Sequence, residues 1–315
     1  MRRRNPSELV EAVAAGNRTA LGRLLSVVEQ AGVDADVVAA LVWPLGGQAY
    51  SVGITGAPGA GKSTLTDRLI AATRATGSEV AVLAIDPSSP YTGGAILGDR
   101  VRMGDHFTDE GVFIRSMATR GQLGGLALAV PEAVRVLDAA GFAWVLIETV
   151  GVGQVEVDIA GAADTTVVVV NPGWGDSVQA NKAGLMEIAD IFVINKADRK
   201  GAAQTQRDLE GMLDLSGFDH EAWRPPILRT TAATGEGVSE LWAAIGEHRE
   251  RISSDGALHR RREQRLRVEV RATLSRIVEA RVLGDAAGQV RFNELVNQVI
   301  ARTIDPRTAA ATLLA

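Results

Sequence analysis

Apolar residues along this chain change their spacing twice, which divides the chain into three parts. In the first part they stand at helical spacing over about 9–13 and again over about 18–32. Asn5 and Pro6 suit the cap and the first position of the earlier helix. We therefore predict an N-terminal helical segment over residues 1–45.

From residue 50 the pattern changes to short runs rich in β-branched residues, mostly separated by segments of helix length. The seven runs cover 50–55, 80–85, 112–115, 144–149, 165–171, 191–195 and 226–231. Nearly continuous apolar strands that alternate with helices are typical of a mostly parallel sheet covered on both faces. The pattern predicts an α/β domain with a seven-strand sheet over residues 46–252.

Beyond residue 253 the pattern is helical again, which predicts a C-terminal extension over 253–315. The segment 259–281 holds eight arginines and three glutamates beside one apolar stripe. The stripe consists of Leu266, Val270, Leu274, Ile277 and Val278. A nucleic-acid arm is one interpretation, but such a helix more often has a solvated face and packs its stripe on a partner helix. We expect this extension to form a dimer.

Composition narrows the class of protein further. The 315 residues are 46% hydrophobic and 23% charged, as in ordinary soluble globular proteins. The net charge of −5 argues against a general nucleic-acid binder, and no apolar run approaches the ~18 residues of a membrane span. With no cysteine, the chain can form neither disulfides nor thiolate metal sites. We expect a cytoplasmic protein without a nucleic-acid or membrane partner.

The strongest motif is a phosphate-binding loop. Residues 56–63 read Gly-Ala-Pro-Gly-Ala-Gly-Lys-Ser, and they follow a predicted strand and precede a helix, as G-x-x-x-x-G-K-[ST] requires. Inward-turned backbone N–H groups and the helix N-terminus favour phosphate there. Lys62 would neutralise the β- and γ-phosphates in catalysis, and the Ser63 hydroxyl would bind Mg²⁺. The predicted phosphate-binding residues are Gly59, Ala60, Gly61, Lys62, Ser63 and Thr64.

A second motif points to guanine as the base. Asn195, Lys196 and Asp198 belong to an N-K-x-D segment that ends the sixth strand. The Asp198 carboxylate can accept hydrogen bonds from guanine N1–H and the exocyclic amine, which adenine does not offer in that pattern. Thr231 and Ala232 end the last strand, where a backbone amide could reach the guanine oxygen. Since ligands of such sheets bind beyond the carboxyl ends of the strands, both motifs together predict GTP and GDP.

The elements for metal binding and hydrolysis are less standard. Glu148 and Gly151 end the fourth strand, where many GTPases carry D-x-x-G. A glutamate can reach Mg²⁺ directly or through water, and the Gly151 amide can sense the γ-phosphate. Asp86 offers a second carboxylate at this sheet edge, although a turn cap before Pro87 is the alternative. Asp99 lies in a Gly-rich segment, which fits either a switch loop or an ordinary surface loop.

Taken together, these strings resemble the MeaB/ArgK group of GTPases, which assist adenosylcobalamin-dependent acyl-CoA mutases, chiefly methylmalonyl-CoA mutase. The resemblance spans most of residues 10–250. It rests on the strings at 56–64, 86–103, 113–125, 148–154 and 184–198, together with the helical start at 16–29.

The resemblance implies a homodimer in which the C-terminal extension supplies much of the contact. It also implies that Asp86, Asp99 and Glu148 gather around Mg²⁺, and we assign Asp86 and Glu148 to catalysis as well. Gln154 would lie in the second switch. Three residues after Gly151, it does not match the water-positioning glutamine that directly follows D-x-x-G in other GTPases.

One stretch departs from the family pattern. Over 175–184, Asp176, Gln179 and Lys182 match the loop that acts as a third switch in the family. A Gly-Ile pair and a second lysine of that pattern are replaced. The resemblance implies that these three residues, with Gln154, couple the nucleotide site to the mutase, and the replacements predict altered coupling.

Other functions remain alternatives. A nickel-insertion GTPase of the related group would need closely spaced Cys and His ligands, whereas this chain has no cysteine and four scattered histidines. A kinase or ATPase acting on transport proteins, as the ArgK name once suggested, is a further alternative. A scaffold with an inactive nucleotide site conflicts with the intact phosphate loop and carboxylates.

Hydrolysis is expected to be slow without a partner. Phosphoryl transfer to water depends on positioning and charge neutralisation, and an arginine that acts in cis often supplies part of that charge. Arg100, Arg115 and Arg120 are candidates in Gly-rich segments, but no spacing selects one of them. We therefore predict slow intrinsic turnover that a partner accelerates.

Overall fold

The computed structural model describes most of the chain and divides it into two units. It describes residues 5–86, 106, 108–118, 125–149, 159–174, 184, 186–215 and 223–314, without the side chains of Asp86, Ala118, 125–128 and Ala160. The first unit covers Met1–Arg262 and the second covers Glu263–Ala315.

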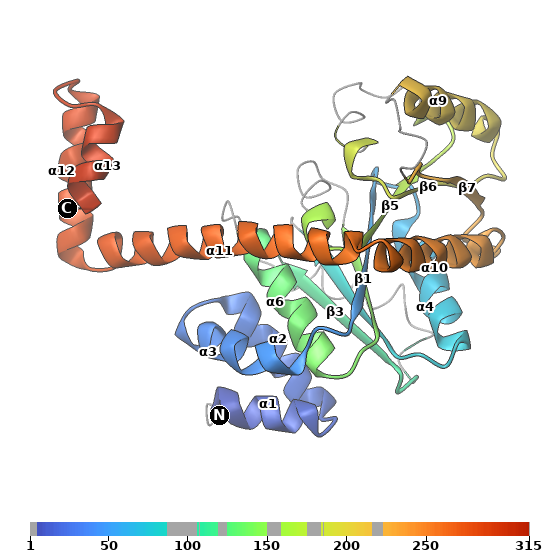
Figure 1. Cartoon of the computed structure of the whole chain (residues 1–315), viewed down its shortest axis with the longest axis horizontal. Helices are drawn as coiled ribbons and strands as arrows, with labels where there is room; N and C mark the ends of the chain where they lie inside the picture. Colours follow the sequence, from blue (N-terminus) through green and yellow to red (C-terminus); the bar gives the residue numbers. More distant parts are fainter. Residues whose placement is uncertain are drawn as a thin grey trace. The chain divides into compact units, whose positions relative to one another are not determined.

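A seven-strand parallel sheet forms the centre of the first unit (Figure 1). Its strands are β1 (Tyr50–Gly56), β2 (Val80–Asp86), β3 (Val112–Ala118), β4 (Trp144–Thr149), β5 (Thr165–Val170), β6 (Ile191–Asn195) and β7 (Ile227–Thr230). They are ordered β3-β2-β4-β1-β5-β6-β7, and every neighbouring pair is parallel. The predicted fold class is confirmed, with β3 extending three residues beyond the predicted run.

Helices cover both faces of this sheet because successive strand residues point to opposite sides. On β2, for example, Val82 joins a buried cluster with Leu65 of α4, whereas Leu83 joins another with Leu137 of α6. One face carries α4 (Lys62–Ala75) and α10 (Val238–Ser254), and the other carries α6 (Gly125–Ala139) and α9 (Ala202–Leu215). The result is a three-layer α/β/α arrangement (Figure 1).

Three N-terminal helices extend the layer that contains α6. They are α1 (Pro6–Ala14), α2 (Arg18–Gln30) and α3 (Val33–Val42), followed by a 3₁₀ turn at Trp43–Leu45. The Asn5 side chain accepts a hydrogen bond from the Ser7 N–H and caps α1, and Leu24 and Leu25 of α2 are fully buried. These helices belong to the same buried cluster as α6 and strands β2, β3 and β4.

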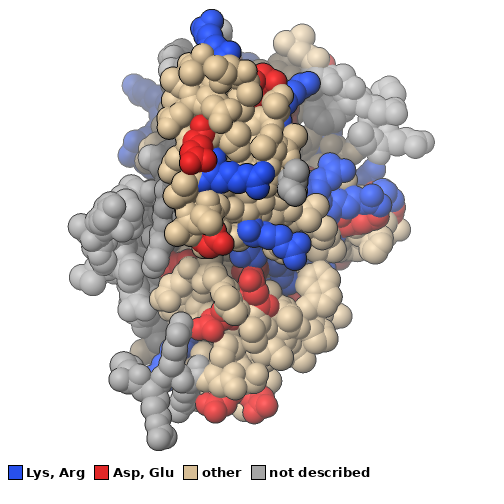
Figure 2. Space-filling view, turned by 90° about the vertical axis from the view of Figure 1, so that its left-hand side faces the viewer, with Lys and Arg blue, Asp and Glu red and all other residues tan. Residues whose placement is uncertain are grey.

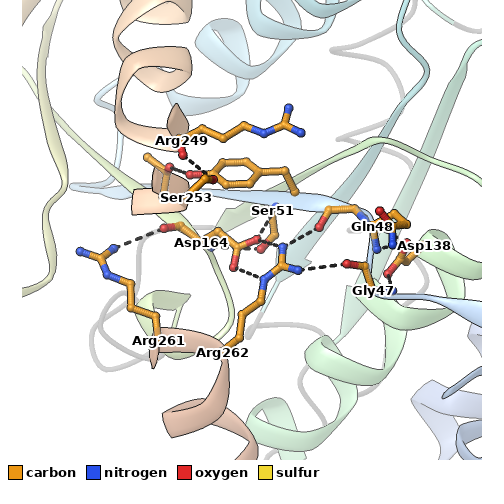
Figure 3. A network of polar contacts seen from close by, with 12 residues as sticks. Gly47, Gln48, Ser51, Asp138, Asp164, Arg249, Ser253, Arg261 and Arg262 are labelled. Atoms are coloured by element: carbon orange, nitrogen blue, oxygen red, sulfur yellow. Dashed lines mark hydrogen bonds and ion pairs between the residues drawn. The ribbon is translucent and has the colours of Figure 1, made fainter. Parts of the chain in front are cut away.

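An ion pair fixes the start of α11 (Ala257–Leu283) to the edge of the sheet opposite the carboxyl ends of the strands (Figure 3). Arg262 donates to the buried Asp164 carboxylate from Nε at 3.1 Å and from a terminal nitrogen at 2.7 Å. Asp164 also accepts from the Ser51 N–H at 3.1 Å. Arg262 further donates to the carbonyls of Gly47 and Ala49, so it joins α11 to the residue before β5 and to the segment before β1.

A second ion pair lies beside the first. Both terminal nitrogens of Arg261 lie 2.9 Å from Oδ1 of the buried Asp190, and the Thr166 N–H donates to Oδ2 at 2.8 Å. His248 Nε2 lies 3.2 Å from the same Oδ1. Burial alone would raise the pKa of Asp190, but these contacts outweigh it and hold that pKa below its usual value.

The second unit is helical, as predicted. It contains the rest of α11, with α12 (Ala286–Ile300) and α13 (Pro306–Leu314) packed together through the buried Leu295 and Ala309. The predicted apolar stripe of α11 is exposed in this chain, with side chains between 36% and 67% accessible. Across the described parts of the chain, no helix is both long and apolar enough for a membrane crossing.

Candidate nucleotide-binding site

Two glycines shape the phosphate loop because the chain passes close to its neighbours there. Gly56 ends β1 with φ of 129°, and a Cβ on it would lie 2.0 Å from the Val169 carbonyl oxygen. Gly61, directly before Lys62, has φ of 92°, and a Cβ there would lie 2.4 Å from Asn195 Nδ2. Only glycine fits both the positive φ and the contact distance.

The loop's lysine and its predicted metal ligand each bind a neighbouring group of the protein. Lys62 is buried, and its Nζ donates to the carbonyls of Gly56 at 2.6 Å and Ala57 at 3.0 Å. Ser63 Oγ donates to Oε1 of the buried Glu148 of β4 at 2.5 Å. Hydroxyl and carboxylate oxygens are the ligands that Mg²⁺ prefers, so this pair fits the predicted metal site.

Several predicted site residues remain predictions. Asp86 ends β2 at the same sheet edge as Gly56, and its side chain lies outside the described residues. The predicted residues that lie wholly outside them are Asp99, Gly151, Gln154, Asp176, Gln179 and Lys182, with Arg100 and Arg120. Among the described side chains, no three His, Cys, Asp or Glu residues group as a metal site.

Asn195 connects the phosphate loop to the turn that follows β7. Its Nδ2 donates to the Ala60 carbonyl at 2.8 Å, and its Oδ1 accepts from the Thr230 hydroxyl and the Ala232 N–H, both at 3.0 Å. The side chain is buried. Asn195 therefore sets the spacing between the predicted phosphate and base sites.

The rest of the guanine motif surrounds this junction. Lys196 adopts φ of 59°, and its Nζ donates to the Gly59 carbonyl at 2.7 Å. Asp198 is exposed in the turn after β6, and the Thr231 N–H donates to the Glu236 carbonyl at 2.9 Å. The fold thus brings the loop after β1 and the ends of β6 and β7 to one place, as expected from their order in the sheet.

The structure adds one residue to this site that no motif indicated. Arg68 of α4 donates from Nε to the Ala232 carbonyl at 3.0 Å and from a terminal nitrogen to the Ala233 carbonyl at 3.1 Å. The contact joins the helix of the phosphate loop to the turn after β7. It depends on two segments that meet only in the folded chain, so the sequence carries no signal for it.

Arg115, one of the three candidate arginines, contacts the N-terminal helices. Arg115 lies within β3, not in a Gly-rich segment. One of its terminal nitrogens donates to Glu29 at 2.7 Å and to the Ser26 hydroxyl at 3.0 Å, both on α2. The strand continues to Ala118, so the alternation of the strand directs Arg115 to the N-terminal helices.

A parallel sheet with a Gly-Lys-Ser loop after β1 and an Asn-Lys-x-Asp segment after β6 defines a P-loop GTPase. The family model described as "Methylmalonyl Co-A mutase-associated GTPase MeaB" matches residues 21–287, and the chain belongs to this family.

Known proteins are similar over most of the chain. A Pyrococcus abyssi protein that is named as a GTPase is 51% identical over 309 residues, covering 98% of this chain and 95% of the relative. Escherichia coli GTPase ArgK is 34% identical over 319 residues, covering 98% and 95%. The mouse protein named methylmalonic aciduria type A homolog, mitochondrial, is 37% identical over 222 residues, covering 70% and 54%. A crystal structure of an LAO/AO transport system kinase superimposes with a TM-score of 0.73 at 25% identity, covering 99% of this chain and 97% of that one.

Proposed function

We propose that this protein is a GTP-hydrolysing chaperone of an adenosylcobalamin-dependent methylmalonyl-CoA mutase. It would gate cofactor loading and protect or reactivate the mutase in the cytoplasm. The observation that carries the proposal is the contact of Asn195 with both the phosphate loop and the turn after β7, in a chain whose family is described as mutase-associated.

The described residues suit phosphoryl transfer to water. This reaction depends on positioning and on neutralising the charge of the phosphates rather than on covalent chemistry by the protein. Lys62 would supply one positive charge, and the loop amides would bind phosphate oxygens. Ser63 and Glu148, with Asp86 and Asp99, would hold Mg²⁺, which neutralises phosphate charge when it is bound.

Slow intrinsic hydrolysis is part of the proposal. Arg115, one of three candidate arginines, is engaged by Glu29 and is therefore directed to the N-terminal helices. We infer that the mutase raises the hydrolysis rate through the predicted switch residues Gln154, Asp176, Gln179 and Lys182.

The hydrolytic part is tested by phosphate release from GTP with Mg²⁺ and after chelation of Mg²⁺. Lys62→Ala should abolish turnover, because it removes the cation of the phosphate loop. Lys200→Ala, which removes an exposed lysine, is the matched control and should leave the rate unchanged. Turnover by Lys62→Ala at the wild-type rate would contradict the assignment.

The kinase alternative is tested in the same assay. The similar crystal structure carries the name of a transport system kinase. With γ-labelled GTP, a GTPase releases labelled phosphate to water, whereas a protein kinase transfers the label to protein. Stoichiometric labelling of added transport protein would favour the alternative.

We also propose that the chain consists of a GTPase domain over residues 46–252 and a C-terminal extension over residues 253–315. The extension would form a homodimer. The exposed stripe of α11 supports this, because apolar side chains at helical spacing favour a partner helix. In the view of Figure 2, basic side chains lie among acidic and uncharged ones, unlike the basic stripe that is typical of nucleic-acid binders. Leu274→Asp should give a monomer in sedimentation experiments, whereas Ser275→Asp should not; a dimeric Leu274→Asp variant would refute this interface.

A further inference from the structure

The turn after β7 is held from two sides. On one side, Asn195 Oδ1 accepts from the Ala232 N–H at 3.0 Å. On the other, Arg68 donates to the carbonyls of Ala232 and Ala233 at 3.0 and 3.1 Å. Asn195 also binds the phosphate loop, and Arg68 belongs to the helix that this loop begins. Both contacts therefore fix the position of the turn relative to the phosphate loop.

The hydrogen bonds of this turn leave one amide directed outward. The Ala232 N–H donates to Asn195, and the Thr234 N–H donates to the Thr231 carbonyl at 2.9 Å. Within the part of the chain that the structure describes, the exposed Ala233 N–H has no hydrogen-bond partner. In a trans peptide the carbonyl and the next N–H point in opposite directions. By holding the Ala232 carbonyl, Arg68 therefore turns the Ala233 N–H away from α4.

We propose that Arg68 is a positioning residue for guanine recognition, because it fixes the peptide that presents the Ala233 N–H to the 6-oxygen of the base. The proposal rests on the proposed guanine-nucleotide function. Guanine carries an acceptor at position 6, whereas adenine carries an amino group there. A fixed N–H donor therefore favours guanine and opposes adenine.

The chemistry of arginine suits this role. Its planar guanidinium offers several donors in a rigid fork, so one side chain binds two successive carbonyls and sets their orientation. Lysine is a compact charge on a flexible stem and does not reproduce the fork. Arg68→Lys should therefore retain only part of the preference for a base with a 6-oxygen, and Arg68→Ala should lose the part that depends on Arg68.

The test compares bases with and without the 6-oxygen. Equilibrium binding is measured with GDP, with 2-aminopurine riboside diphosphate, which lacks the 6-oxygen and with it the N1–H, and with inosine diphosphate, which lacks only the 2-amino group. Loss of the N1–H weakens the analogue equally in wild type and Arg68→Ala, so the effect of the substitution on each nucleotide reports the 6-oxygen. Wild-type protein should bind GDP about tenfold or more tightly than the 2-aminopurine analogue. Arg68→Ala should weaken GDP binding about three- to tenfold while changing binding of that analogue less than about twofold.

Two internal controls distinguish positioning from a general loss of structure. The ratio of GDP to inosine diphosphate binding depends on Asp198 and should stay the same in Arg68→Ala. Arg74→Ala removes an arginine of the same helix that binds Asp109 and the Ser78 carbonyl instead, and it should leave every ratio unchanged.

Three results would overturn the proposal. Arg68→Ala could weaken all three nucleotides equally, which would indicate a structural role, or it could change none of them. Wild-type protein could also bind GDP and the 2-aminopurine analogue equally well, so that the turn does not sense the 6-oxygen. Failure of the proposed function itself would look different, because wild-type protein would then show no preference for GDP over ADP.

Discussion

Replacing Arg262 by alanine tests how the start of α11 contributes to the stability of the first unit. The substitution removes two hydrogen bonds to Asp164 and two to the backbone before β1 (Figure 3). The substitution also removes the cation that pairs with the Asp164 carboxylate, which is only 2% exposed. The negative charge of Asp164 is then left with little compensation from water.

The expected loss in the free energy of unfolding lies between two limits. Removing one partner of a fully buried ion pair costs about 3–5 kcal/mol, whereas an exposed pair is worth about 0.2–1 kcal/mol. The Arg262 side chain is 31% exposed, so solvent screens part of the interaction. We expect Arg262→Ala to lower the free energy of unfolding by about 2–3 kcal/mol, and a double-mutant cycle with Asp164→Ala to give a coupling of about 1–2 kcal/mol.

Urea unfolding followed by tryptophan fluorescence measures this cost in the relevant unit. All five tryptophans lie between residues 43 and 242, within the first unit. Arg224→Ala is the control in the same unit, because its pair with Asp214 has side chains 50% and 64% exposed and should contribute about 0.2–1 kcal/mol. Equal costs for Arg262→Ala and Arg224→Ala, or a coupling near zero, would contradict this expectation.

Three further predictions concern the site and the sheet edge. Asp198→Asn should reduce the preference for GDP over ADP at least tenfold without changing the thermal unfolding temperature; unchanged preference in competition binding would refute the base assignment. Gly61→Ala should weaken nucleotide binding at least tenfold, because its Cβ would lie 2.4 Å from Asn195 Nδ2, and wild-type affinity in calorimetry would contradict the loop geometry. Since the pKa of Asp190 is lowered in the folded state, its charge stabilises the fold above about pH 4, and this contribution is lost as pH falls through the folded pKa. Unfolding experiments should therefore show the stability difference between wild type and Asp190→Asn narrowing below about pH 4, and a difference independent of pH would contradict the ion pair.

The sheet and the phosphate loop were predictable because short-range patterns determine them. Strands such as Thr165–Val170 are buried on both faces, so nearly every position is apolar or β-branched. Gly56 and Gly61 combine a positive φ with a contact that excludes a side chain, so they leave a clear sequence signal. The order of these elements then brings the two nucleotide motifs to one edge of the sheet.

Contacts between distant segments were not predictable in this way. Arg68 and Arg262 resemble many other arginines of the chain, and only the folded arrangement selects the carbonyls and carboxylate that they bind. Arg115 shows the same limit. It was a candidate for catalysis because glycine-rich sequence lies near it, whereas the alternation of the strand directs its side chain to α2. Long-range partners depend on packing, which local patterns do not encode.

We propose above that a mutase controls GTP hydrolysis by this protein. The most direct measurement is the rate of GTP hydrolysis by the purified protein with and without saturating methylmalonyl-CoA mutase from the same organism, with Lys62→Ala as the inactive control. We expect slow turnover by the protein alone and acceleration of about tenfold or more with the mutase. A rate that the mutase leaves unchanged would contradict it.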